Sequence, residues 1–135
     1  MNKQIYVNLP VKNLERSREF FSSLGYSFNA QFSNEQGACM VVSDHIYVML
    51  LVESYFQTFT KKPVADSTKV TEVLTCLSCD SRAEVDELVA KALAAGGKAP
   101  NAPQDHGFMY AHGFEDLDGH IWELVYMTEA AAGNS

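Results

Sequence analysis

The residues best suited to chemistry lie near the C-terminus, where an acidic turn runs into a strand-like segment carrying one carboxylate. The turn is 115–119, with the sequence EDLDG, and the carboxylate is Glu123, which stands among apolar neighbours. Gly119 allows the positive φ that a tight strand connection often needs, and aspartates form local side-chain to backbone bonds in turns. An unpaired carboxylate in a strand costs free energy if it is buried, so Glu123 is a candidate for acid/base chemistry or ligand binding.

His112 is the histidine best placed to act with Glu123. If Glu115 pairs with His120 across the turn, counting back along the antiparallel hairpin sets His112 directly opposite Glu123. Directly opposed side chains lie within contact range, so the two would form either an acid/base couple or a structural ion pair. A register shift of one residue would separate them, because it moves every side chain of a strand to the other face.

The cysteines Cys39, Cys76 and Cys79 are odd in number, so they do not form a complete set of disulfides. Cys76 and Cys79 have the spacing of redox and zinc motifs, but no second ligand cluster accompanies them in the sequence. They also lie in a strand-like run, where residues three apart face opposite sides. We therefore predict buried structural thiols in a cytoplasmic protein.

The composition is that of one ordinary soluble domain. The chain has 135 residues, of which 47% are hydrophobic and 20% charged. Its net charge of −7 argues against binding to nucleic acid or an anionic membrane and is compatible with cationic ligands. We expect no signal peptide, and no apolar run approaches the roughly 20 residues that span a bilayer. Motifs for a nucleophile triad, a phosphate loop or a dinucleotide site are absent from the sequence.

Apolar patterns predict the same order of elements in both halves. In the first half, a strand at 5–11 precedes a helix that Asn13 caps and Gly25 ends. Strand-like runs follow at 26–32, 39–43 and 46–52.

In the second half, a strand at 70–79 precedes a helix that begins with a capping box at Ser81 and ends near Gly96. A short strand near 98–101 and strands at 108–115 and 120–127 follow. The pattern predicts an α+β fold made of two tandem β-α-β-β-β modules, with the helices on one face of each sheet. The predicted limits are about 3–53 for module 1, 54–69 for a linker, about 70–127 for module 2 and 128–135 for a disordered tail. The linker is either a loop packed on the domain or a lid.

This repeat resembles the vicinal oxygen chelate superfamily, which includes glyoxalase I, bleomycin-resistance proteins and extradiol dioxygenases. Residues 116–123 are similar to its D-x-D-G-x-x-x-E ending, and residues 11–26 look like its first strand and helix. Residues 8–11 and 119–123 look most like glyoxalase-like bacterial proteins. The resemblance implies a curved mixed sheet that forms a cup with helices on its outer face, and a homodimer.

Strand alternation predicts which side chains face the cup. Glu123 faces it in the last strand, and Glu72 and Leu74 do so in the strand at 70–79. The predicted ligand-binding residues are Tyr6, Asn8, Tyr47, Met49, Leu51, Glu72, Leu74, Tyr110 and Phe114.

The metal-dependent relatives place ligands once on each of four such strands, and the resemblance lays those positions over Tyr6, Met49, Leu74 and Glu123. Only Glu123 is a usual ligand, whereas catalytic metal sites commonly use three or more protein ligands. We therefore predict no cofactor and a lost metal site. The alternative is a divalent metal held by Glu123, His112 and a further residue such as Glu72.

Two functions remain from the sequence. The first is a metal-free protein that binds or sequesters a small aromatic or cationic molecule, as drug-sequestering members of the superfamily do. The alternative is a glyoxalase-type lyase or isomerase, metal-dependent or not, that uses Glu123 with His112 in acid/base catalysis. Proton exchange lost in Glu123→Gln would favour the enzyme, and tight binding without turnover would favour sequestration.

Overall fold

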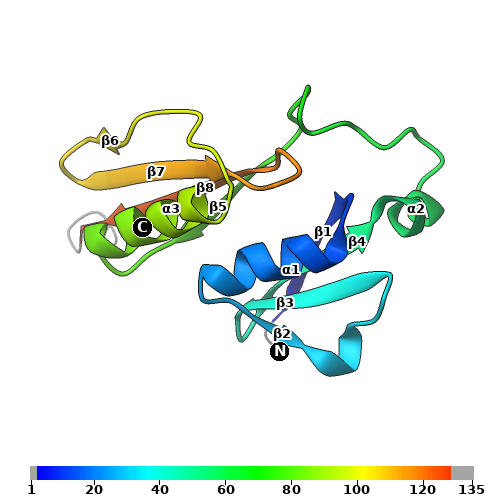
Figure 1. The fold of residues 1–135 in the computed structure, drawn as a ribbon. Coiled ribbons are helices and arrows are strands. Elements are labelled where there is room, and N and C mark those ends of the chain that lie inside the picture. Colours follow the sequence, from blue (N-terminus) through cyan, green and yellow to red (C-terminus); the bar gives the residue numbers. More distant parts are fainter. Residues whose placement is uncertain (1–2, 129–135) are drawn as a thin grey trace. The chain divides into compact units, whose positions relative to one another are not determined.

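The computed structural model describes residues 3–128, and the chain divides into two compact units, residues 1–66 and 67–135. Each unit contains a four-stranded mixed sheet and a long helix (Figure 1). Both units have the order strand, helix, then three strands, so the predicted α+β class with two β-α-β-β-β modules is confirmed. No helix within residues 3–128 is long and apolar enough to span a membrane.

The first unit is a sheet with strand order β1-β4-β3-β2, in which β1 pairs parallel to β4 and the other pairs are antiparallel. Its elements are β1 (Ile5–Val11), α1 (Leu14–Ser23), β2 (Ser27–Asn29), η1 (Ala30–Phe32), β3 (Gly37–Ser43), β4 (Ile46–Val52), α2 (Glu53–Phe56) and η2 (Gln57–Phe59). The cap was predicted correctly, because the Asn13 side chain accepts a hydrogen bond from the Arg16 N–H at 3.1 Å. Helix α1 buries Phe20 and Phe21 in the core.

The second unit repeats this plan with strand order β5-β8-β7-β6. Its elements are β5 (Leu74–Ser78), α3 (Arg82–Ala94), β6 (Gln104–Asp105), β7 (Met109–Glu115) and β8 (Ile121–Met127). The Ser81 side chain caps α3 by accepting a hydrogen bond from the Glu84 N–H. The Glu84 carboxylate accepts from the N–H of Asp80, whereas the predicted capping box would use the N–H of Ser81.

Several predicted strands are shorter in the structure. The strand predicted at 70–79 begins at Leu74, and the strand predicted near 98–101 is a single bridge between Lys98 and Glu115. The run at 26–32 divides into β2 and the 3-10 helix η1. The predicted linker at 54–69 contains most of α2 and all of η2, and its role as loop or lid stays a prediction. Of the predicted tail at 128–135, Thr128 donates to the Phe108 carbonyl, and 129–135 lie outside the described residues.

The core of the second unit lies between α3 and the sheet. Val85 and Val89 of the helix are buried with Trp122 and Leu124 of β8. Asp116, only 6% exposed, is a charged residue in this core. Its carboxylate accepts hydrogen bonds from the Trp122 indole at 3.0 Å and from the backbone N–H groups of Asp118 and His120. Burial raises the pKa of this carboxyl group, and the hydrogen bonds act in the opposite direction.

Candidate functional site

The hairpin of β7 and β8 has a different register from the one predicted. The N–H of Asp116 donates to the carbonyl of His120, so these two residues close a loop of three residues, and Glu115 pairs with Ile121. Gly113 therefore lies opposite Glu123, and the prediction that His112 opposes Glu123 is wrong. The error is one residue, which is enough to place the two side chains on opposite faces of the sheet.

The same shift corrects the predicted positions of two aromatic residues. Tyr110 faces helix α3, where its hydroxyl donates to Asp86 at 2.6 Å. Phe114 is 1% exposed and stacks on Trp122 with ring centroids 6.2 Å apart. Both side chains thus lie on the helix-facing side, with His112 between them, and the prediction that Tyr110 and Phe114 face the cup with Glu123 is wrong.

On the face away from α3, the Glu123 side chain bends over Gly113. A Cβ atom built on Gly113 would lie 2.9 Å from Glu123 Oε2 and 2.6 Å from the Trp122 carbonyl oxygen. Only a glycine leaves this space for the carboxylate. Gly113 is therefore a site residue that sequence reasoning missed, although a glycine in the interior of a predicted strand is a known sign of a close approach.

The Glu123 carboxylate borders a pocket of about 200 Å³. The pocket lies between β7, β8 and the segment that leads into β6. Its lining residues are Pro100, Asn101, Ala102, Gln104, Ala111, His112, Gly113 and Glu123. No lysine or arginine is among these described residues, and within residues 3–128 the Glu123 side chain has no hydrogen bond or ion pair. The pocket thus combines polar backbone and amide groups with one uncompensated carboxylate.

His112 contributes to the pocket without pairing with Glu123. Its Nε2 lies 3.2 Å from the Asn101 carbonyl oxygen, which ties β7 to the lining segment. His112 and Glu123 therefore border one pocket, but they do not form a hydrogen-bonded couple.

The cysteines differ partly from the prediction. Cys79 is buried as predicted, but Cys76 is exposed, so the prediction of buried structural thiols at these two positions is wrong for Cys76. Cys39 is also buried. Cys76 pairs with Glu123 in the parallel register of β5 and β8. Burial, and to a smaller extent the negative charge of Glu123, raises the pKa of the Cys76 thiol. Burial, together with nearby carboxylates, raises the pKa of the Cys79 thiol to about 11. Neither is activated as a thiolate.

The predicted residues of the first unit share one face of its sheet. In the parallel register of β1 and β4, Tyr6 pairs with Tyr47 and Asn8 pairs with Met49. The rings of Tyr6 and Tyr47 stack at 4.8 Å between centroids, and the Tyr6 hydroxyl donates to Gln4. Leu51 lies on this face but is only 3% exposed.

The two remaining predicted residues lie at the start of the second sheet. Glu72 precedes β5 rather than lying within it, and Leu74 is 59% exposed at the first position of that strand. Neither borders the pocket of Glu123.

The donor set does not suit a divalent metal. Among residues 3–128, no group of three or more His, Cys, Asp or Glu side chains is arranged to hold an ion. Of the four positions that the resemblance singles out, Tyr6 holds its hydroxyl against Gln4, and Met49 and Leu74 offer no oxygen or nitrogen. Glu123 alone would leave the charge of the ion uncompensated.

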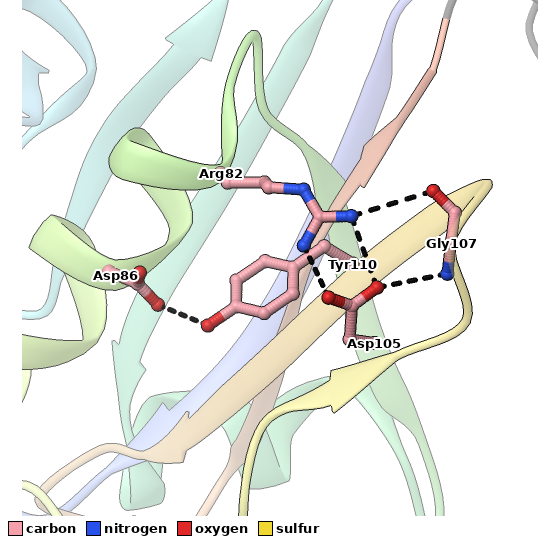
Figure 2. Close-up of polar contacts among 5 residues, drawn as sticks. All are labelled: Arg82, Asp86, Asp105, Gly107 and Tyr110. Atoms are coloured by element: carbon pink, nitrogen blue, oxygen red, sulfur yellow. Dashed lines mark hydrogen bonds and ion pairs between the residues drawn. The ribbon is translucent and has the colours of Figure 1, made fainter.

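A second polar cluster, which no sequence motif predicted, joins the start of α3 to β6 and β7 (Figure 2). Arg82 at the start of α3 forms a bidentate ion pair with Asp105 of β6, at 2.6 and 3.0 Å. Its guanidinium also lies 5.0 Å from the centre of the Tyr110 ring. Asp105 accepts a further hydrogen bond from the Gly107 N–H.

We predict that the Asp105 carboxyl titrates far below its ordinary range. The hydrogen bond from Arg82 and that from Gly107 lower its pKa from 3.8 to about 2. Because the folded pKa is lowered, the stabilisation from this pair is present above pH 3.8 and is lost as the pH falls through about 2. NMR titration of the side-chain carboxyl carbon should give this value, and Arg82→Gln should return it towards 3.8. An unchanged value in Arg82→Gln would contradict the assignment of the cause.

Comparisons with known proteins agree with this fold. Residues 3–43 match the protein family described as bleomycin resistance protein-like N-terminal. Among solved structures, a hypothetical protein from S. aureus is 28% identical with a TM-score of 0.79, covering 93% of this chain and 95% of its own. No protein of curated function matches the chain significantly.

Two more distant structures share the fold. A glyoxalase/bleomycin resistance protein/dioxygenase family enzyme from Burkholderia phytofirmans is 15% identical, with a TM-score of 0.77 and coverage of 94% of this chain and 100% of its own. The fosfomycin resistance protein FosX from Mesorhizobium loti is 14% identical, with a TM-score of 0.69 and 98% coverage of both chains. At these identities the likeness concerns the fold alone.

Proposed function

This chain belongs to the vicinal oxygen chelate superfamily, and on that premise we propose that it binds a small cationic or aromatic molecule without a metal ion. The site is the pocket of Glu123, with the carboxylate as the anchor for the charge of the ligand. The fosfomycin resistance protein with this fold is named for resistance to a small molecule, which is consistent with a protective binding role.

The position of Glu123 carries the proposal. Its carboxylate bends over Gly113 at the edge of the pocket, and within residues 3–128 it has no cationic partner. A half-buried carboxylate without such a partner is stabilised by a ligand that donates hydrogen bonds and carries positive charge. The pocket volume of about 200 Å³ suits a compact group or one end of a larger molecule.

The residue types at the other three inherited ligand positions argue for binding without metal. Tyr6, Met49 and Leu74 supply at most one oxygen, and the Tyr6 hydroxyl is already hydrogen-bonded to Gln4. No catalytic step through a metal is therefore assigned to this site.

A second candidate is a lyase or isomerase of the glyoxalase type that uses Glu123 with His112. One observation favours it, since both residues border the same pocket. The corrected register weakens it, because the two side chains leave the sheet from opposite faces. A bound substrate would have to reach both groups around the edge of β7.

Benzamidine tests the binding proposal, because it joins an aromatic ring to an amidinium that matches a carboxylate. We expect it to bind about tenfold more tightly than neutral benzamide, since a charge-assisted hydrogen bond contributes roughly 1.5–3 kcal/mol. Glu123→Gln should remove this preference. Isothermal titration calorimetry or ligand-observed NMR on the purified protein would measure both dissociation constants.

Glu72→Gln is the matched control, because Glu72 is an acidic residue outside the pocket, and its replacement should leave the preference unchanged. Equal affinity for benzamidine and benzamide in the parent protein would contradict the anchor role of Glu123. Titration with Zn²⁺, Ni²⁺ and Mn²⁺ should leave the melting temperature unchanged. A large increase that Glu123→Gln abolishes would overturn the metal-free proposal.

A further inference from the structure

One wall of the Glu123 pocket is a thin, exposed segment, which we call the wall segment, residues 99–105. All of its residues are exposed. Its first anchor is the reciprocal backbone pair between Lys98 and Glu115, with N···O distances of 3.1 and 2.7 Å. A segment with few buried groups opens locally at low free-energy cost unless something holds its far end.

The far end is held by few backbone contacts. Strand β6 has two residues, Gln104 and Asp105, paired with Ala111 and Tyr110. Midway along the segment, the Asn101 carbonyl contacts His112. A two-residue strand at the edge of a sheet is a weak attachment, so side-chain contacts at this end determine how often the wall is closed.

The strongest side-chain contact at this end comes from helix α3. Arg82 spans to Asp105 with two hydrogen bonds and lies over the ring of Tyr110, which is itself hydrogen-bonded to Asp86 (Figure 2). The bidentate geometry fixes the orientation of Asp105 as well as its distance from the helix.

We propose that Arg82 is a positioning residue for the pocket, which acts through Asp105 to hold the wall segment closed beside Glu123. The hydrogen-bond partners of Arg82 are Asp105 and Gly107, which do not line the pocket, but Asp105 directly follows the lining residue Gln104. The ion pair is partly exposed, with side-chain exposures of 42% and 53%, so it restrains the segment without locking it. Access to the pocket is thereby coupled to an ion pair on the far side of its wall.

The test uses a thiol introduced into the pocket by Ala111→Cys, in a Cys76→Ser background that removes the exposed native thiol. The rate of labelling with neutral iodoacetamide then reports how often the wall segment opens. We expect Arg82→Gln and Asp105→Asn each to raise this rate about two- to fivefold, the range set by a partly exposed ion pair. The double variant should show no further increase, because both changes remove one interaction.

Two controls separate the ion pair from general loosening. Tyr110→Phe removes the hydrogen bond to Asp86 but leaves the ion pair, so the labelling rate should stay unchanged. Arg82→Lys retains the charge and should restore part of the protection. Labelling in roughly 1 M NaCl should accelerate with Arg82 present and not in Arg82→Gln, since salt screens the pair.

An unchanged rate in both single variants would overturn the proposal, and so would an additive increase in the double variant. The inference rests on the pocket of the proposed function, but the labelling experiment needs no ligand. A protein that fails to prefer benzamidine and yet passes the labelling test would disprove the ligand class while supporting the role of Arg82.

Discussion

Asp116→Ala is expected to lower the free energy of unfolding by about 3 kcal/mol, because it leaves the buried Trp122 indole N–H and two backbone N–H groups without acceptors. Asp116 is 6% exposed, so water replaces little of what is lost. For a domain of this size the melting temperature should fall by about 10 °C. Urea unfolding followed by tryptophan fluorescence would measure the change, and Trp122 is the only tryptophan in the sequence.

Glu115→Ala is the matched control, since it removes a carboxylate from the neighbouring position without a buried hydrogen bond. We expect it to change stability by no more than about 0.5 kcal/mol. A double-mutant cycle of Asp116→Ala with Trp122→Phe should show a coupling of about 1–2 kcal/mol, since the second change removes the unsatisfied indole donor. Equal stability of Asp116→Ala and the parent would show that the turn does not depend on this carboxylate.

Gly113→Ala is expected to damage both the stability of the second unit and its pocket. The added Cβ would lie 2.6 Å from the Trp122 carbonyl oxygen and 2.9 Å from Glu123 Oε2, closer than such atoms pack. Because backbone must shift, we expect a loss of about 1–3 kcal/mol in unfolding free energy. The Glu123 carboxylate must also move, so the preference for benzamidine over benzamide should fall. Urea unfolding and calorimetry measure the two effects separately.

Adding Glu123→Ala to Gly113→Ala separates the effects of the two close contacts on stability. It removes the clash with the carboxylate and leaves the one with the Trp122 carbonyl, so stability should recover only in part. Full recovery would mean that the backbone contact is harmless. A Gly113→Ala protein with parental stability and parental ligand preference would show that the carboxylate does not need the space above Gly113.

Local rules were sufficient for the elements. Asn13 and Ser81 were predicted as caps because their side chains can accept from N–H groups three residues later, and both do so. Period-two alternation correctly separated Glu123 from the helix-packed face of β8, where Trp122 and Leu124 are buried. Caps and strand alternation depend on residues that are close together in the sequence, so the sequence is sufficient to predict them.

The hairpin register was predicted incorrectly because it depends on a hydrogen-bond network. The prediction paired Glu115 with His120, whereas the buried Asp116 forms that pair and also accepts from Trp122. Counting residues across an acidic turn does not reveal which aspartate is buried. The register of β7 with β8 determines on which face of the sheet Tyr110, His112 and Phe114 lie, since a shift of one residue reverses the alternation of a whole strand.

The sequence by itself determined the two-module plan, the caps, the acidic balance and the presence of one strand carboxylate. Only the tertiary structure decided the surroundings of that carboxylate, with Gly113 beneath it and Cys76 beside it, and the ion pair between Arg82 and Asp105. Arg82 and Asp105 are 23 residues apart, with no periodic pattern linking them. Contacts of this kind arise from strand pairing and helix packing, whose geometry is a property of the folded chain rather than of any local run of residues.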